Sequence, residues 1–455
     1  MNRLELLAKA KAEREVKDWA SSANTLAPWV TKEPQDTAAA YYYAMALLEI
    51  GQANKARGYF ERLIGWGKHL PQAHYMLARS FVELDQLEAA YRHFETAHQL
   101  GPTDLTLRAV AKGAWMAGDM DRFGAVLSSA GGTQAVVAYG LFVEAERYQE
   151  AEDLWARLPT EMVARAESQV LRSRHMRQIG DGPAADIAAQ RAALLTPDAA
   201  SVVDAFAVAK MMIGDAHSAL RAIEPMRLAQ PNNQYWIAHE ATVLRLLGDP
   251  RYETLMDFDR FVRSYRLPVP EGYADSAAFN RALQAELETH HHASNHPLDQ
   301  SLRLGTQTAQ DLLAMESPAV RAYIKALKVP VSQYIAEIGQ GHEHPLTARN
   351  TGQFTIKGCW SVRLTAGGHH VNHVHPQGWI SSAYYVSVPS GQDERGGWIK
   401  FGQPPFETNP PMMPEKWVQP ARGMLVLFPS YMWHGTHPIG AGEPRMTAPF
   451  DVVPA

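Results

Sequence analysis

Three histidines and one arginine near the C-terminus have the residue types and the spacing of a metal site next to an anion site. His373 and His375 form a His-x-His pair, His434 follows 59 residues later, and Arg445 follows after another 11 residues. Along an extended strand alternate side chains point to the same face, so the pair can reach one metal ion while Val374 packs the other way. Imidazole is a common ligand for iron, zinc, copper and nickel, and a guanidinium offers a planar fork that fits a carboxylate. The pattern therefore predicts a three-histidine metal site beside an anion-binding arginine.

Short strands in the same region are expected to hold these side chains in place. Met424 to Phe428 read as a buried strand that ends at Pro429-Ser430, a few residues before His434. Arg445-Met446-Thr447 opens the next expected strand and precedes an apolar strand end at Phe450 to Val453. Four aromatic residues could wall the site, although at strand spacing such residues more often belong to the core: Trp360, Trp379, Trp398 and Phe401.

Other residues near the pair could compete for the metal. The chain has 19 histidines, and most are expected to be surface or hydrogen-bonded residues. His369, His370 and His437 lie close enough in sequence to act as alternative ligands. Asp393 and Glu394 lie in the polar stretch SGQDERGG, and we interpret them as solvated loop charges rather than as a relocated ligand.

From about Phe279 to the C-terminus, over a third of the chain, the sequence resembles the iron and 2-oxoglutarate dependent oxygenases, and in particular a bacterial branch of that superfamily. The resemblance rests on the order and spacing of six segments, each of which is weak alone. They are QSLRLGTQT, CWSVRL, NHVHPQGWISSAYYVSVP, GGWIKFGQP, GMLVLFPSYMWHGTHP and RMTAPFDVVP.

The resemblance implies a double-stranded β-helix, or jelly roll, that holds Fe(II). In that superfamily an H-x-D or H-x-E pair and a distal histidine bind the iron, and these positions fall on His373, His375 and His434. Here His375 stands in place of the usual carboxylate. Either the site has three histidine ligands, or His375 orients a water molecule or the substrate and the metal keeps two protein ligands. With three neutral ligands the ion keeps its full charge, which favours anionic co-ligands.

The resemblance also implies 2-oxoglutarate as a cosubstrate, consumed with O2 to give succinate, CO2 and a hydroxylated product. An arginine about ten residues past the distal histidine grips the far carboxylate of 2-oxoglutarate in that superfamily, and here this position is Arg445. In that superfamily a tyrosine on the strand after the first pair often helps to bind this carboxylate, and Tyr384, the first residue of Tyr384-Tyr385, is the better match to it. Thr447 is placed to add a hydroxyl to the same carboxylate.

The first half of the chain is self-similar at a period of 34 residues. Between about Asp36 and Leu267 it is rich in Ala and Leu, and three small or aromatic residues recur one period later: Ala44, Ala56 and Phe60 return as Ala78, Ala90 and Phe94. This is the tetratricopeptide repeat (TPR) pattern of stacked helix pairs, of which we expect six or seven. Such a solenoid commonly binds a peptide or protein on its concave face. Alternatively the helices only brace the oxygenase or mediate self-association.

Two prolines and a glycine in LPVPEGYADS mark a boundary between the halves. We therefore expect an all-α TPR-like solenoid over residues 1–266, a linker over 267–276 and a double-stranded β-helix oxygenase domain over 277–455. Three supporting helices are expected in the second domain, over Ala277 to Leu287, Thr308 to Met315 and Ser317 to Ile338.

Composition limits the remaining possibilities. The net charge is −5, with 43 basic and 48 acidic residues and no block of like charge, which argues against nucleic acid as the principal partner. The single Cys359 fits a reducing compartment. The N-terminus reads as a charged amphipathic helix without a signal peptide or membrane anchor, so we expect a soluble, cytoplasmic protein.

Three hypotheses of function follow. The first is a hydroxylase that uses Fe(II) and 2-oxoglutarate and acts on a protein or peptide substrate recruited by the repeats. The second is a three-histidine dioxygenase that uses no oxoacid. Arg445 and Thr447 argue against it, because they are placed to bind an oxoacid. The third is a catalytically inactive TPR adaptor, for which the missing carboxylate ligand is the best support.

Overall fold

The computed structural model describes residues 2–392 and 395–455, and these residues form two compact units. The first unit runs to Leu141 and includes His292–Asn295, and the second comprises Phe142–His291 and His296–Ala455. The domain boundary expected at 267–276 lies inside the second unit, where it separates repeat helices from most of the strands, and it stays a prediction.

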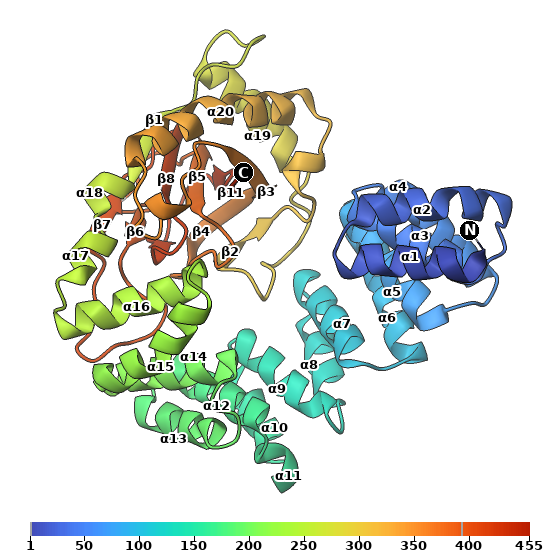
Figure 1. Cartoon of the computed structure of the whole chain (residues 1–455), viewed down its shortest axis with the longest axis horizontal. Coiled ribbons are helices and arrows are strands. Elements are labelled where there is room, and N and C mark those ends of the chain that lie inside the picture. Colours follow the sequence, from blue (N-terminus) through green and yellow to red (C-terminus); the bar gives the residue numbers. More distant parts are fainter. Residues whose placement is uncertain (1, 393–394) are drawn as a thin grey trace. The chain divides into compact units, whose positions relative to one another are not determined.

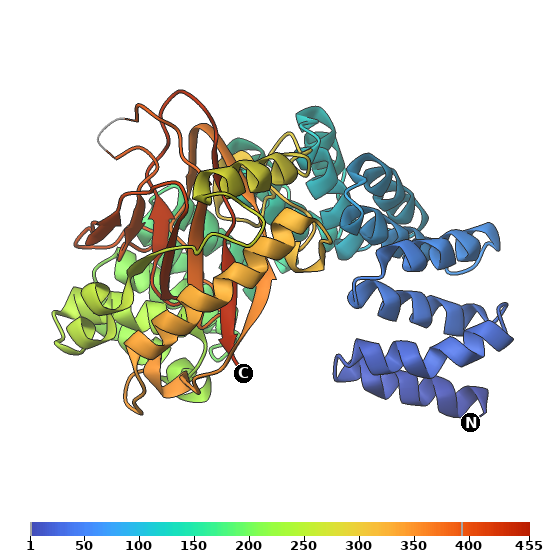
Figure 2. The same cartoon turned by 90° about the horizontal axis from the view of Figure 1, so that it is seen from above.

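The first unit consists of helices that run back and forth in succession (Figure 2). They are α1 (Arg3–Glu15), α2 (Trp19–Lys32), α3 (Thr37–Glu49), α4 (Ala53–Gly65), α5 (Leu70–Glu83), α6 (Leu87–Leu100), α7 (Asp104–Met116) and α8 (Met120–Ser128), after which α9 (Gln134–Glu144) leads into the second unit. The small and aromatic residues of the 34-residue period are buried where successive helices touch, with Ala56 and Phe60 fully inaccessible. The repeat prediction is therefore confirmed, and the pair α1–α2 precedes the expected start at Asp36.

The second unit continues with further helix pairs. They are α10 (Tyr148–Trp155), α11 (Thr160–Val163), α12 (Ala166–Gln178), α13 (Gly182–Ala193), α14 (Ala200–Met212), α15 (Ala216–Ala229), α16 (Gln234–Leu247), α17 (Arg251–Leu255) and α18 (Phe258–Phe261). Alanines again sit where helices approach closely, since Ala185, Ala207 and Ala219 are fully buried. An alanine at such a position lets two helices pack at short distance without a cavity.

Two antiparallel sheets follow (Figure 1). The strands are β1 (Arg263–Arg266), β2 (Leu302–Gln307), β3 (Phe354–Cys359), β4 (Val362–His370), β5 (Ile380–Ser387), β6 (Ile399–Phe401), β7 (Lys416–Val418), β8 (Met424–Pro429), β9 (His434–Thr436), β10 (Arg445–Thr447) and β11 (Phe450–Pro454). The larger sheet has the order β1-β8-β5-β10-β4-β2, with β11 between β3 and β5, and the smaller has the order β7-β6-β9. Repeat helices followed by this double-stranded β-helix are the fold class that the sequence predicts.

Two helices cover one face of the larger sheet, α19 (Ser276–Glu288) and α20 (Pro318–Ile338) (Figure 2). Both were expected from their apolar spacing, and Phe279, Leu283, Tyr323 and Leu327 join strand residues in one buried core. No helix in the described part of the chain is both long and apolar enough to cross a membrane.

The helix expected over Thr308 to Met315 is wrong, because only a single 3-10 turn forms there, η1 (Leu312–Ala314). The backbone N–H of Thr308 donates to the carbonyl of Ser361, which keeps the start of the segment attached to the sheet. The Asp311 carboxylate then accepts from the N–H groups of Leu313 and Cys359. These bonds to the sheet take the place of the intrahelical bonds that the apolar spacing suggested.

Candidate metal centre

Backbone hydrogen bonds hold the segments that carry the three histidines next to each other. His373 and His434 form an isolated antiparallel bridge, in which each N–H donates to the other residue's carbonyl at 2.9 and 3.0 Å. The N–H of His375 donates to the carbonyl of Ser430, in the turn between β8 and β9. The close approach requires Gly435, because a Cβ there would lie 2.4 Å from Oδ1 of Asn372. His373 and His434, 61 residues apart in the sequence, are thus fixed side by side.

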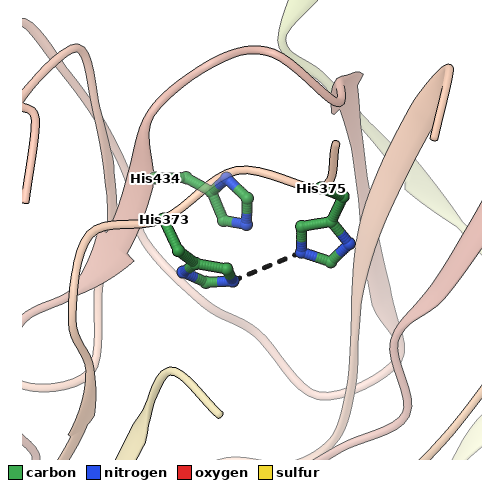
Figure 3. Close-up of side chains that lie close together, drawn as sticks. All are labelled: His373, His375 and His434. Carbon is green, nitrogen blue, oxygen red and sulfur yellow. Dashed lines mark hydrogen bonds between the residues drawn. The ribbon is translucent and has the colours of Figure 1, made fainter. Parts of the chain in front are cut away.

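The three imidazole rings converge on one point (Figure 3). Their candidate ligand nitrogens all lie within 4.8 Å of one another, and Nε2 of His373 is 3.2 Å from Nε2 of His375. The ring centroids of His373 and His434 are 4.2 Å apart. Among the described residues this is the group of histidine, cysteine and acidic side chains that could hold a metal ion.

A hydrogen bond at each Nδ1 fixes the orientation of each ring. His373 Nδ1 lies 2.9 Å from the carbonyl oxygen of Val371, and His434 Nδ1 lies 2.9 Å from that of Met432. His375 Nδ1 lies 2.7 Å from Oδ2 of Asp451. Oxygen acceptors require the proton on Nδ1, which leaves the Nε2 lone pair free. All three lone pairs therefore face the common point, as a metal site needs.

Burial keeps two of the three histidines in the neutral form. Burial, with a smaller contribution from the neighbouring His375, lowers the pKa of His373 to about 3. Burial likewise holds the pKa of His434 well below its usual range. A neutral imidazole is the form that binds a metal, so the ion need not displace protons at neutral pH. The residues present fit a borderline divalent ion such as Fe(II).

Arg445 is a buried cation beside this cluster. It is 2% exposed, and its Nη1 donates to the carbonyl of Gly397 at 2.7 Å. Its Nε has no hydrogen-bond partner among the described residues, and no described carboxylate pairs with it. Burial lowers its pKa, while the nearby Tyr385 has the opposite effect. A buried charge without a counter-ion is costly, and an anion bound in the cavity beside this guanidinium would offset that cost.

Alternation along β10 and β5 decides which side chains accompany Arg445. Arg445 and Thr447 line the same cavity, while Met446 lies between them in the core. Thr447 is the cross-strand partner of Tyr385, whose hydroxyl is buried without a partner among the described residues and whose ring lies 5.8 Å from the guanidinium. The hydroxyl of Tyr384 instead donates to Asn280 at 2.9 Å, away from the cavity. The structure therefore brings Tyr385 to the site and not Tyr384, a choice set by register.

A cavity of about 1410 Å³ opens on the three histidines. One wall comes from the sheets and includes Trp360, whose ring stacks on His375 at 5.9 Å. Other lining residues come from the repeat helices and the turns between them: Glu144, Glu146, Tyr148, Arg174, Arg177 and Gln178. Sequence reasoning did not predict these lining residues. Of the other aromatic residues considered, Trp379 and Phe401 belong to the core.

The competing residues have other roles. His370 stacks on His373 at 5.8 Å and hydrogen-bonds to Ser301, which also contacts Nε2 of His373. His369 contacts the carbonyl of Gly367, and His437 packs against an aromatic ring. Asp393 and Glu394 lie outside the described residues.

One protein-family model matches the part of the chain that contains this site. Residues 358–451 match the family model described as "Putative 2OG-Fe(II) oxygenase", in which 2OG is 2-oxoglutarate. The chain therefore joins helical repeats to a domain that matches this family model over residues 358–451. The match includes His373, His375, His434 and Arg445, and it covers less than a quarter of the chain. No curated protein matches the chain.

Solved structures resemble each half loosely. A Pseudomonas putida prolyl-4-hydroxylase is 18% identical with a TM-score of 0.29, covering 44% of this chain and 98% of its own. A Trichoplax adhaerens prolyl hydroxylase in complex with a hypoxia inducible factor peptide fragment is 15% identical with a TM-score of 0.30, covering 46% and 92%. A tetratricopeptide repeat protein from Parabacteroides merdae is 14% identical with a TM-score of 0.36, covering 56% and 90%. At these scores the architecture rests on the helices and strands described above.

Proposed function

We propose that this protein is an Fe(II)- and 2-oxoglutarate-dependent oxygenase that hydroxylates a protein or peptide substrate. The observation that carries the proposal is the pairing of three convergent imidazoles with a buried arginine that lacks an anionic partner among the described residues. His373, His375 and His434 would hold the metal, and Arg445 would hold the far carboxylate of 2-oxoglutarate. When bound, iron and the oxoacid supply the oxidation of a substrate C–H bond by O2, with succinate and CO2 as co-products.

Tyr385 and Thr447 would complete the oxoacid site, with Tyr385 in place of the Tyr384 expected from the sequence. Burial raises the pKa of Tyr385 to about 12, so its hydroxyl stays protonated and can donate to a carboxylate. Thr447 is 4% exposed and lies beside it. Two hydroxyls and a guanidinium facing one cavity satisfy a carboxylate that water can no longer solvate.

We propose that His375 is a direct ligand. Its Nδ1 is engaged by Asp451, so Nε2 is the nitrogen that remains, and Nε2 faces the corresponding atom of His373. No carboxylate occupies the ligand position of His375, but the Asp451 carboxylate lies behind His375 and contacts its Nδ1. A carboxylate on Nδ1 makes the imidazole a stronger donor to a metal and restrains its rotation.

A polypeptide substrate is supported by the size and walls of the cavity. A pocket for a small molecule usually occupies about 300–1,000 Å³. The cavity here is larger, at about 1410 Å³, and repeat residues such as Tyr148, Arg174 and Arg177 line it together with the histidines. A peptide segment could reach the metal while contacting the sheets and the repeat helices.

Anaerobic titration tests the cosubstrate. Adding 2-oxoglutarate to the Fe(II)-loaded protein should produce the weak metal-to-ligand charge-transfer band in the visible spectrum. A protein that binds iron but does not respond to the oxoacid would be a three-histidine dioxygenase of another kind. A protein that binds no divalent metal would be an adaptor. The substrate class is tested with a peptide library, in which members that stimulate succinate release should gain one oxygen atom by mass spectrometry.

A further inference from the structure

The residues next to the metal ligands in the chain do not pack only on the oxygenase sheets. Val374, between the two paired histidines, and Trp433, just before His434, form a small buried cluster with Ala238 of helix α16. This cluster is separate from the main core of the sheets. Trp433 is 3% exposed and Val374 is 8% exposed. A repeat helix therefore touches both segments that carry ligands.

The contact of Trp433 with α16 is specific as well as apolar. Its indole Nε1 donates to Oγ1 of Thr242 at 2.9 Å, and this bond is buried. The Thr242 hydroxyl donates its own proton to the carbonyl of Ala238 at 2.8 Å, so its oxygen can accept the hydrogen bond from the indole. The Trp433 ring also meets His239 edge-on at 5.6 Å. Contacts with α16 thus fix the position and the rotamer of Trp433.

Two more bonds tie the same segments to α16. The N–H of Gln234, at the start of the helix, donates to the carbonyl of Pro376, one residue beyond His375. Arg245, near its end, donates to the carbonyl of Gly402, whose own N–H donates to the carbonyl of Trp433. Phe406, four residues further on, is buried in the core of the repeat helices and stacks on His239.

We propose that helix α16 is a positioning element of the metal centre, acting through Thr242, Ala238 and their contacts with Trp433 and Val374. This role rests on the proposed function, because it assumes that the three histidines bind a metal. Ligand atoms must be held within about 0.5 Å of productive geometry, and loss of an outer support typically costs about 10- to 100-fold in metal affinity. The repeats next to the oxygenase would then be part of its active site, apart from any role in recruiting a partner.

The experiment measures Co(II) binding to the full-length protein, by calorimetry and by the visible ligand-field spectrum, which reports coordination geometry. Thr242→Val keeps the shape of the side chain and removes the acceptor of the indole bond, so affinity should fall about 10-fold and the spectrum should change. Thr242→Ser keeps the hydroxyl and should restore both. Trp433→Phe removes the donor instead and should reproduce the Thr242→Val result, which covers the case in which that variant fails to fold.

Ser80→Ala is the matched control. Ser80 is a fully buried hydroxyl on α5 whose proton goes to the carbonyl of Met76 four residues earlier, as that of Thr242 goes to Ala238. Its loss should leave Co(II) binding unchanged. Wild-type affinity and spectrum in folded Thr242→Val and Trp433→Phe would overturn the role of α16 while leaving the proposed function standing. Absence of Co(II) binding by the wild-type protein would overturn the metal site itself, and the role of α16 with it.

Discussion

Replacing Arg445 by methionine separates a ligand-binding role of this arginine from a structural one. Methionine keeps the unbranched stem of the side chain and removes the guanidinium group with its charge. In the protein without cosubstrate the guanidinium is buried, donates to Gly397 and has no carboxylate partner among the described residues. If it were part of a structural ion pair, its loss would leave a buried counter-ion behind and cost about 3–5 kcal/mol.

The expected effects have opposite signs with and without 2-oxoglutarate. Without it, the variant loses one hydrogen bond, worth about 1 kcal/mol, and is relieved of a buried charge whose desolvation costs several kcal/mol. We therefore expect its free energy of unfolding to be unchanged or higher. With it, a charge-assisted pair worth about 1.5–3 kcal/mol is missing, so the dissociation constant of 2-oxoglutarate should rise about 10- to 100-fold.

Thermal or denaturant unfolding with Mn(II) as a redox-silent ion checks both effects. At 2-oxoglutarate concentrations about 100 times the wild-type dissociation constant, the ligand stabilises the wild-type protein by about 2.7 kcal/mol, and a 100-fold weaker variant keeps about 0.4 kcal/mol. Arg445→Lys should recover only part of the difference, because an ammonium lacks the planar fork. A variant that is clearly destabilised without ligand, yet gains the wild-type increment with it, would refute this reasoning and assign Arg445 to the scaffold.

Three further predictions concern the histidine cluster. Asp451→Ala should weaken Co(II) binding about 10- to 100-fold in calorimetry, because His375 loses the carboxylate that orients it; an unchanged affinity would remove Asp451 from the site. His375→Asp should still bind Co(II), since it restores the usual ligand set, and adding Asp451→Asn should tighten binding by removing a like charge; loss of metal in both variants would contradict this. For pH, the folded pKa of His373 is about 3 against about 6.5 in the unfolded chain, so its contribution to stability is complete above pH 6.5 and falls as the pH falls. By pH 5 the free energy of unfolding of the metal-free protein should fall by about 2 kcal/mol through this residue. In chelator-treated samples, the free energy of unfolding of His373→Gln should fall less with pH than that of the wild type. Equal slopes of this free energy against pH in the two proteins would count against the burial of this ring.

Local patterns in the sequence predicted the parts of the structure that depend on local chemistry. The 34-residue period required small residues at fixed spacing, and Ala56 and Phe60 are buried as that period demands. The strand before His434 follows from a run of apolar residues. The two histidines of the His-x-His pair converge as expected, but they lie between β4 and β5 with only an isolated bridge at His373 rather than on the strand that was predicted. The 3-10 turn at Leu312–Ala314 shows the limit, because bonds from Thr308 and Asp311 to a distant strand outweighed a helical pattern.

Long-range register decided the parts that could not be predicted. Tyr384 and Tyr385 are equivalent by type, and only the pairing of Tyr385 with Thr447 across β5 and β10 shows which one faces the cavity. Asp451 lies 76 residues from His375, so nothing local connects them. The wall formed by Arg174 and Arg177 depends on how repeat helices meet the sheets within the second unit.

If the three histidines bind a metal as proposed, the charges around the cluster account for a ligand set without a carboxylate. The three histidines bring no carboxylate, and two charged groups that line the same cavity, the buried Arg445 and the partly buried Asp451, are of opposite sign. In the proposed complex a divalent ion and a dicarboxylate would cancel each other in the same way. A site with an additional carboxylate ligand and the same Asp451 would carry net negative charge, which a low-dielectric cavity penalises. In the proposed complex, a carboxylate behind His375 would still influence the metal while the complete assembly stays neutral. Either ligand bound alone would leave a charge that the other relieves.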